Sequence, residues 1–189
     1  MEAAIRAQVE AGALQAAVEA SLAQYGAEVF GLLLVLTKER EQAKDAFADM
    51  TLSLLESLPS FRWEASLRTW MYRVAKNALV RRQSEAWQRK KSPLGPELLS
   101  ALEAVERTTT AVFLKSEVKD QVRRLRDELE VEEQALLSLR VDRQLPFEDV
   151  AEILGLRRDQ APTARKRYER VVEKLRKIAE REGLLGGQD

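Results

Sequence analysis

Apolar residues recur every three to four positions along almost the whole chain, and no stretch has the strict alternation of a half-buried strand. The segments between turn signals are rich in Ala, Leu, Glu and Arg, which favour helix. The pattern therefore predicts an all-α protein. The expected helices lie near residues 2–24, 26–36, 38–58, 66–91, 97–107, 112–129, 132–142, 146–154 and 160–182.

Proline, glycine and serine divide this helical pattern. Pro59 closes one helix, and Ser66 is suited to cap the next one by accepting a hydrogen bond from an amide of its first turn. The segment SPLGPE, residues 92–97, contains two prolines and a glycine, which resist regular structure. We therefore expect two helical domains, over residues 1–92 and 119–189, joined by a linker over residues 93–118.

Composition narrows the possible functions. Of the 189 residues 45% are apolar and 33% charged, and 31 cations balance 31 anions, so DNA binding would have to rest on local basic patches. The chain has no cysteine or histidine, which excludes zinc fingers, disulfides and imidazole catalysis. No Asp- and Gly-rich metal loop is visible, so we expect neither an enzyme nor a cofactor. The longest apolar run is shorter than the roughly 20 residues of a membrane span, which favours a cytoplasmic protein.

The first candidate surface lies in FRWEASLRTWMYRVAKN, residues 61–77. An aromatic loop is followed by a helix whose predicted core-facing residues are Leu67, Trp70, Met71, Val74 and Ala78. An adjacent face carries Arg73, Lys76, Asn77, Val80 and Ser84, and six cations against one anion lie between residues 76 and 91. Such a face is often only solvated. The loop favours nucleic acid, because its aromatic rings can stack on an unpaired base while the cations neutralise phosphates.

The second candidate surface lies in the C-terminal third. Residues 132–158 predict two short helices with a tight connection, in which Pro146 suits a first helical turn and Gly155 a left-handed turn. A third helix follows, with a predicted buried stripe of Ala164, Tyr168, Val171, Leu175 and Ile178. The charged residues beside that stripe are suited to a DNA major groove, although Arg165 and Glu169 also have the spacing of a simple ion pair. These charged residues are Arg165, Lys166, Glu169 and Arg170.

Two blocks, about residues 26–91 and 119–178, resemble the extracytoplasmic-function sigma factors of bacterial RNA polymerase. The first block resembles the family's region two, whose Trp-x-x-Arg-x-Ala-x-Asn-like signature corresponds to Trp70, Arg73, Ala75 or its neighbour, and Asn77. In the second, LPFEDVAEILGL resembles the region-four helix-turn-helix, a motif that also occurs in other bacterial regulators. The two blocks in this order are more specific than either alone.

The resemblance implies a role for each surface. It implies polymerase binding by Ala43, Asp45, Asp49 and Leu52. It implies a pocket for a base flipped out of the minus-ten element, with DNA contacts from Ser60, Phe61, Arg62, Trp63, Arg73, Lys76, Asn77 and Arg81. It implies that Arg165, Lys166, Glu169 and Arg170 read the minus-thirty-five element as duplex. Core RNA polymerase, promoter DNA and an anti-sigma protein are the implied partners.

This chain departs from the family pattern at three points. Trp63 replaces a residue that is usually small, and Arg81 stands where the family often has an acidic residue. Aligning Thr163 with the family's threonine leaves the turn after Gly155 about three residues long, whereas aligning at Gly155 would place Pro162 inside the recognition helix. We expect Asp159 to cap the third helix with Pro162 just inside it.

Two other functions stay open. The chain could be an ordinary helix-turn-helix regulator with a ligand-sensing or dimerising N-terminal domain. It could also be a sigma-like scaffold that binds protein while its longer turn prevents DNA reading. The segment 2–24 has no counterpart in the family motifs, and its stripe of Ile5, Val9, Leu14, Ala17, Val18 and Leu22 suits packing on the first domain or on a partner.

Overall fold

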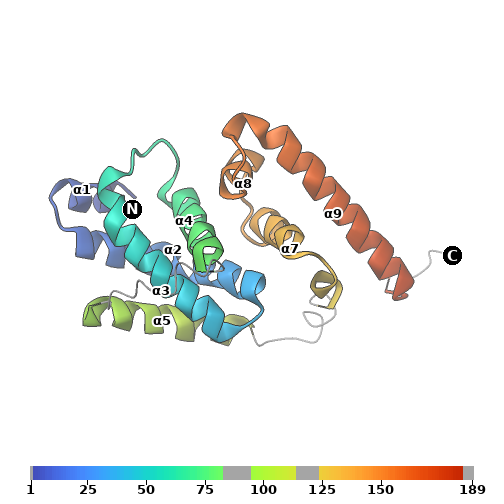
Figure 1. Cartoon of the computed structure of the whole chain (residues 1–189), viewed down its shortest axis with the longest axis horizontal. Helices are drawn as coiled ribbons and strands as arrows, with labels where there is room; N and C mark the ends of the chain where they lie inside the picture. Colours follow the sequence, from blue (N-terminus) through green and yellow to red (C-terminus); the bar gives the residue numbers. More distant parts are fainter. Residues whose placement is uncertain (1, 83–94, 114–123, 185–189) are drawn as a thin grey trace. The chain divides into compact units, whose positions relative to one another are not determined.

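The protein is helical throughout the residues that the computed structural model describes, which are 2–82, 95–113 and 124–184, with residues 106–113 described by their backbone (Figure 1). No strand occurs in these ranges, in agreement with the predicted all-α class. The chain divides into two compact units, Met1–Phe113 and Leu114–Asp189.

Unit 1 is a bundle built around its longest helix. Helix α2 (Leu14–Thr37) packs against the other α-helices that the structure describes in this unit. These are α1 (Glu2–Glu10), α3 (Arg40–Ser57), α4 (Leu67–Arg82) and α5 (Pro96–Phe113), and a 3-10 turn η1 (Leu58–Ser60) follows α3. The α2 side chains of Leu22, Phe30 and Leu33 are fully or almost fully buried. Helix α2 is long and apolar enough to cross a membrane, but half of its most apolar window is covered inside this bundle, as in a core helix.

The expected break at residue 25 is wrong, because α2 runs straight through Gly26. The chain turns earlier, at Gly12, whose φ of 75° lies in the left-handed region that glycine adopts without strain. Gly26 has a packing role instead. A Cβ atom there would lie 2.9 Å from a methyl of Val105 on α5 and 3.4 Å from the ring of Phe47 on α3. The missing side chain lets three helices approach closely.

The segment expected as a linker contains the helix predicted near residues 97–107, and this helix packs within unit 1. Helix α5 begins at Pro96, lies along α2 and buries Leu98 and Val105. Unit 1 therefore extends to Phe113, past the expected boundary at residue 92. Two prolines and a glycine suggested irregular structure, but Pro96 occupies the first helical position, where its missing N–H is not needed.

Helix α4 begins where the sequence predicts. The backbone N–H of Thr69 donates a hydrogen bond to Ser66 Oγ over 3.1 Å, so Ser66 caps the first turn. The predicted core-facing residues Leu67, Trp70, Met71, Val74 and Ala78 are all buried. The described part of the helix ends at Arg82, and the remainder of the expected range, with Ser84, lies outside the described residues.

Unit 2 is a smaller helical cluster. It contains α7 (Val131–Leu137), the π-helical turn η3 (Ser138–Asp142), α8 (Phe147–Ile153), the 3-10 turn η4 (Arg158–Gln160) and α9 (Ala161–Arg181). Its core includes Leu139, Val150, Ile153, Ala164 and Val171. Helices α8 and α9 pack on each other, which is compatible with the predicted helix-turn-helix, and Gly155 has the expected left-handed φ of 83°.

The connection before α9 differs from the expected one. Asp159 lies inside η4, where its carboxylate pairs with the Arg157 guanidinium, and Gln160 is the residue that precedes the helix. Pro162 lies in the first turn of α9, as expected. Arg158 Nη1 donates to Asp149 Oδ1 over 2.9 Å and so ties the turn to α8. The longer connection is thus an ordered 3-10 turn.

Candidate functional site

An aromatic cluster lies at the junction between η1 and α4. The Phe61 ring stacks on the Trp70 ring, with centroids 4.6 Å apart and planes 22° apart. Trp70 is 7% exposed and belongs to the core, as its helical position predicts. Phe61 itself is half-buried, so the loop rests on a fixed aromatic base at the start of α4.

Trp63 is held in an uncommon backbone conformation. Its φ of 59° lies in the left-handed region, which costs a bulky residue about 1–2 kcal/mol. Its ring lies 4.8 Å from the Phe61 ring, and the Arg6 guanidinium of α1 lies 5.8 Å from its centroid. These contacts hold the ring half-buried beside Phe61.

Two other loop residues, Arg62 and Ser60, are exposed but differ in their contacts. Arg62 is exposed, with Nη1 4.0 Å from a carboxylate oxygen of Glu64. Ser60 is also exposed, but its hydroxyl donates to the carbonyl of Ser57 over 2.9 Å, which leaves its oxygen able to accept a further hydrogen bond.

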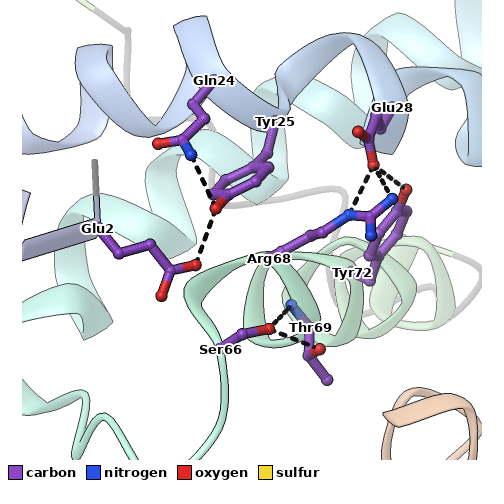
Figure 2. A network of polar contacts seen from close by, with 8 residues as sticks. All are labelled: Glu2, Gln24, Tyr25, Glu28, Ser66, Arg68, Thr69 and Tyr72. Carbon is purple, nitrogen blue, oxygen red and sulfur yellow. Dashed lines mark hydrogen bonds and ion pairs between the residues drawn. The ribbon is translucent and has the colours of Figure 1, made fainter. Parts of the chain in front are cut away.

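Figure 2 shows how polar contacts anchor the start of α4 to α2. One carboxylate oxygen of Glu28 accepts hydrogen bonds from Arg68 Nη2 over 2.6 Å and from the Tyr72 hydroxyl over 3.0 Å. Burial alone lowers the pKa of Arg68, but the hydrogen bond and charge of Glu28 outweigh it and raise that pKa. Arg68 therefore stays charged and fixes the helix from which Arg73 and Asn77 project.

The outer face of α4 presents polar groups to solvent. Arg73 and Asn77 are exposed and Lys76 is half-buried, as the helical period predicts. Arg81 is also exposed, although its Nη2 atom donates a hydrogen bond to Ser53 Oγ of α3 over 2.7 Å. A groove of about 440 Å³ runs between α3 and α4. Its lining consists of Ser53, Glu56, Ser57, Val74, Asn77, Val80 and Arg81.

The predicted polymerase-binding residues on α3 do not share one surface. Asp45 is exposed and Leu52 half-exposed, whereas Ala43 is fully buried and cannot touch a partner in this structure. Asp49 is 6% exposed. Arg82 bridges the two carboxylates, with Nη1 2.5 Å from Asp49 Oδ2 and Nη2 2.5 Å from Asp45 Oδ2. Asp49 thus helps to fasten the end of α4 to α3.

In unit 2 all four predicted DNA-facing residues of α9 are exposed, namely Arg165, Lys166, Glu169 and Arg170. The Arg165 guanidinium lies 5.1 Å from the centroid of the Phe147 ring at the start of α8. The Arg140 guanidinium lies 4.9 Å from the same centroid, and the Tyr168 ring meets it edge-on at 5.7 Å. The contact that the structure shows for Arg165 is therefore a cation–π contact with Phe147, which orients the guanidinium.

Sequence reasoning missed four side chains that support these surfaces. Arg6, Arg82 and Phe147 each contact a predicted site residue from another element, and Arg140 contacts the Phe147 ring. The sequence offered no pairing signal, because contacts between separate helices leave no fixed spacing. Among the described residues no group of three or more carboxylates could hold a metal ion.

Comparison with known proteins points to the same part of the chain as the site described above. The family model described as Sigma-70 region 2 matches residues 22–89, a segment that contains the aromatic loop and α4. The RNA polymerase sigma factor YlaC of Bacillus subtilis (strain 168) is 33% identical over 138 residues, which make up 70% of this chain and 76% of that protein.

The Arg82 bridge is testable through stability. Arg82→Ala is expected to lower the free energy of unfolding by about 3 kcal/mol, because it removes the guanidinium from a nearly buried carboxylate. Asp45→Asn is the matched control and should cost about 0.5 kcal/mol, since Asp45 is exposed. Urea unfolding followed by circular dichroism measures both. Equal, small losses for the two variants would show that the bridge does not fasten α4.

Proposed function

Because this chain belongs to the sigma-70 family of RNA polymerase sigma factors, in the extracytoplasmic-function group that its sequence resembles, we propose that its two units divide promoter recognition between them. A sigma factor is not an enzyme; it directs core RNA polymerase to promoters and starts transcription there. In our proposal unit 1 binds polymerase and the minus-ten element. Unit 2 reads the minus-thirty-five element.

Polymerase binding is assigned to the exposed side of α3. Asp45 and Leu52 supply an anionic and an apolar contact at this surface. Asp49 would contribute indirectly, because its carboxylate pairs with Arg82, which also pairs with Asp45. Ala43 is left out of the proposed contact because it has no exposed surface.

The minus-ten element is assigned to the loop and the outer face of α4. Phe61 and Trp63 offer ring faces on which an unpaired base can stack, with Ser60 and Arg62 at the exposed edge of the loop. Flipping a base out of duplex costs a few kcal/mol, which stacking and phosphate contacts offset. The helix that follows the loop, α4, would hold the separated strand through Arg73, Lys76, Asn77 and Arg81.

One observation carries this assignment most directly. The aromatic loop is anchored on Trp70, and the exposed Arg73 and Asn77 project from the helix that begins a few residues later. Stacking groups on the loop and a cation on the helix that follows it thus occur close together in the chain, which is the combination that single-stranded DNA binding needs. Both lie within the segment that matches the Sigma-70 region 2 model.

The minus-thirty-five element is assigned to the exposed face of α9. Arg165 can bridge the O6 and N7 atoms of guanine, and the neighbouring Lys166 and Arg170 can hold phosphates. Glu169 is suited to accept a hydrogen bond from a cytosine amino group. The ordered turn η4 supports this reading, because it fixes the start of α9 against α8.

The unit 1 assignment is tested on a promoter located by mapping transcription start sites after overexpression. The double variant Arg73→Gln, Lys76→Gln is expected to bind core polymerase normally but to open the promoter less well. Losing two phosphate contacts to single-stranded DNA should reduce the slope of log affinity against log salt by about 1.4. Pull-down of core enzyme, run-off transcription and salt titration are the measurements.

Arg40→Gln, which removes an exposed cation from the start of α3, is the matched control and should leave the slope unchanged. A double variant with the wild-type slope would refute the assigned DNA contact. An ordinary helix-turn-helix regulator would bind the duplex promoter tightly without polymerase, so gel shifts with and without core enzyme separate that function from the proposed one.

The unit 2 assignment is tested through Phe147. Phe147→Leu keeps an apolar side chain but removes the ring face that orients Arg165. Preference for the natural minus-thirty-five sequence over a scrambled one is expected to fall about threefold, as for the loss of a modest cation–π contact. The control is Val172→Leu, an exposed position on α9. Unchanged preference in the Phe147 variant would refute the orienting role of the ring, and no preference in the wild type would favour a scaffold that does not read this element.

An anti-sigma protein is a further proposed partner, inferred from the family resemblance, and we expect it to act in the cytoplasm with polymerase. To block initiation it would cover the surface around Asp45 and Leu52. Affinity capture of the tagged chain should then recover either that protein or core polymerase, and added core enzyme should displace it. Capture of a protein that leaves polymerase binding unaffected would contradict this role.

A further inference from the structure

Helix α1 lies against the aromatic loop although it precedes the segment that matches the Sigma-70 region 2 model. It is anchored at two points. Ile5 is 2% exposed, and the Glu2 carboxylate accepts a hydrogen bond from the Tyr25 hydroxyl over 2.8 Å (Figure 2). Burial, together with the hydrogen bond to Glu2, raises the pKa of Tyr25 to about 12, so this hydroxyl keeps its proton at neutral pH.

The Arg6 side chain reaches from the exposed side of α1 to Trp63 in the loop. The Arg6 guanidinium lies 5.8 Å from the centroid of the Trp63 ring. Trp63 in turn packs on Phe61, and Phe61 stacks on Trp70 in the core. A continuous series of cation–π and aromatic contacts therefore runs from α1 to α4, with the loop between them.

Trp63 needs such support. Its φ of 59° is one that tryptophan rarely adopts, and strained residues persist only where the surrounding structure holds them. Phe61 contacts the ring from within the same loop, whereas Arg6 is a contact from another helix. Arg6 thus ties the ring to an element outside its own loop.

We propose that Arg6 is a positioning residue for the capture of the minus-ten base, and that α1 thereby forms part of the promoter-binding site. The inference rests on the proposed role of the loop as the base pocket. Arg6 holds the Trp63 ring in one orientation before DNA arrives, so that less conformational entropy is lost when a flipped base stacks on it. Arg6 itself need not touch the base.

The simpler explanation is that Arg6 only forms a surface ion pair. Its Nε donates to Glu10 Oε1 over 2.9 Å, with both side chains more than half exposed. Exposed pairs at this helical spacing contribute little to stability, so this pair gives Arg6 no strong structural role. Glu10→Gln removes the ion pair and leaves the guanidinium in place, which makes it the matched control.

The test measures promoter opening by the full chain bound to core polymerase. The probe is a promoter from start-site mapping, with 2-aminopurine in its minus-ten element, whose fluorescence rises when the base unstacks. Arg6→Met is expected to reduce the opening equilibrium about threefold, as the loss of an exposed cation–π contact predicts. Arg6→Lys should restore most of it, because an ammonium also binds the ring face, and Glu10→Gln should behave as wild type.

Three further measurements separate the possible outcomes. Core polymerase affinity and the melting temperature should be unchanged in Arg6→Met; a loss of either that accounts for the reduced opening would overturn the inference. Wild-type opening in Arg6→Met, or an equal loss in Glu10→Gln, would overturn it as well. Trp63→Gly removes the ring and suits the left-handed backbone. If that variant also opens the promoter normally, the base-pocket assignment fails and the inference with it, whereas a defect in Trp63→Gly alone rejects only the role of Arg6.

Discussion

The attachment of α4 to the bundle is the constraint on which the unit 1 surface depends. Its inner face is apolar and buried, and charged contacts fasten it near both ends. Glu28 of α2 holds Arg68 and Tyr72 at the start, and Asp45 and Asp49 of α3 hold Arg82 at the end. A helix fixed in this way cannot rotate about its axis. The orientation of the helix therefore determines which of its residues face solvent.

The two units hold their arginine side chains by different kinds of contact. In unit 1 two carboxylates pair with the partly buried Arg82, while Arg73 remains exposed on the same helix. In unit 2 the Arg165 guanidinium lies over an aromatic ring, which orients it without neutralising its charge. A cation held by a ring stays available to DNA. A cation bridged by two carboxylates does not.

Much of the architecture could be predicted because it depends on local rules. The core-facing residues of α4, the Ser66 cap and the left-handed Gly155 all follow from helical period or backbone preference. The errors have a common cause. The sequence predicts a helix boundary at residue 25, next to Gly26, and a linker after residue 92, because glycine and proline are turn signals in isolation. Contact between α2 and α5 explains both differences, since it needs a small residue at Gly26 and draws the helix predicted near residues 97–107 into unit 1.

By itself the sequence determined the helical class, the faces of the helices and the family resemblance that comparison with known proteins then supported. Each follows from residue order along one segment, in which period and capping are encoded. Only the tertiary structure decided which charged residues remain available. Asp49 and Asp45 look alike in the sequence, yet one is nearly buried and the other exposed. The link between Arg6 and Trp63 likewise exists only in the fold, because packing brings together residues that have no fixed separation along the chain.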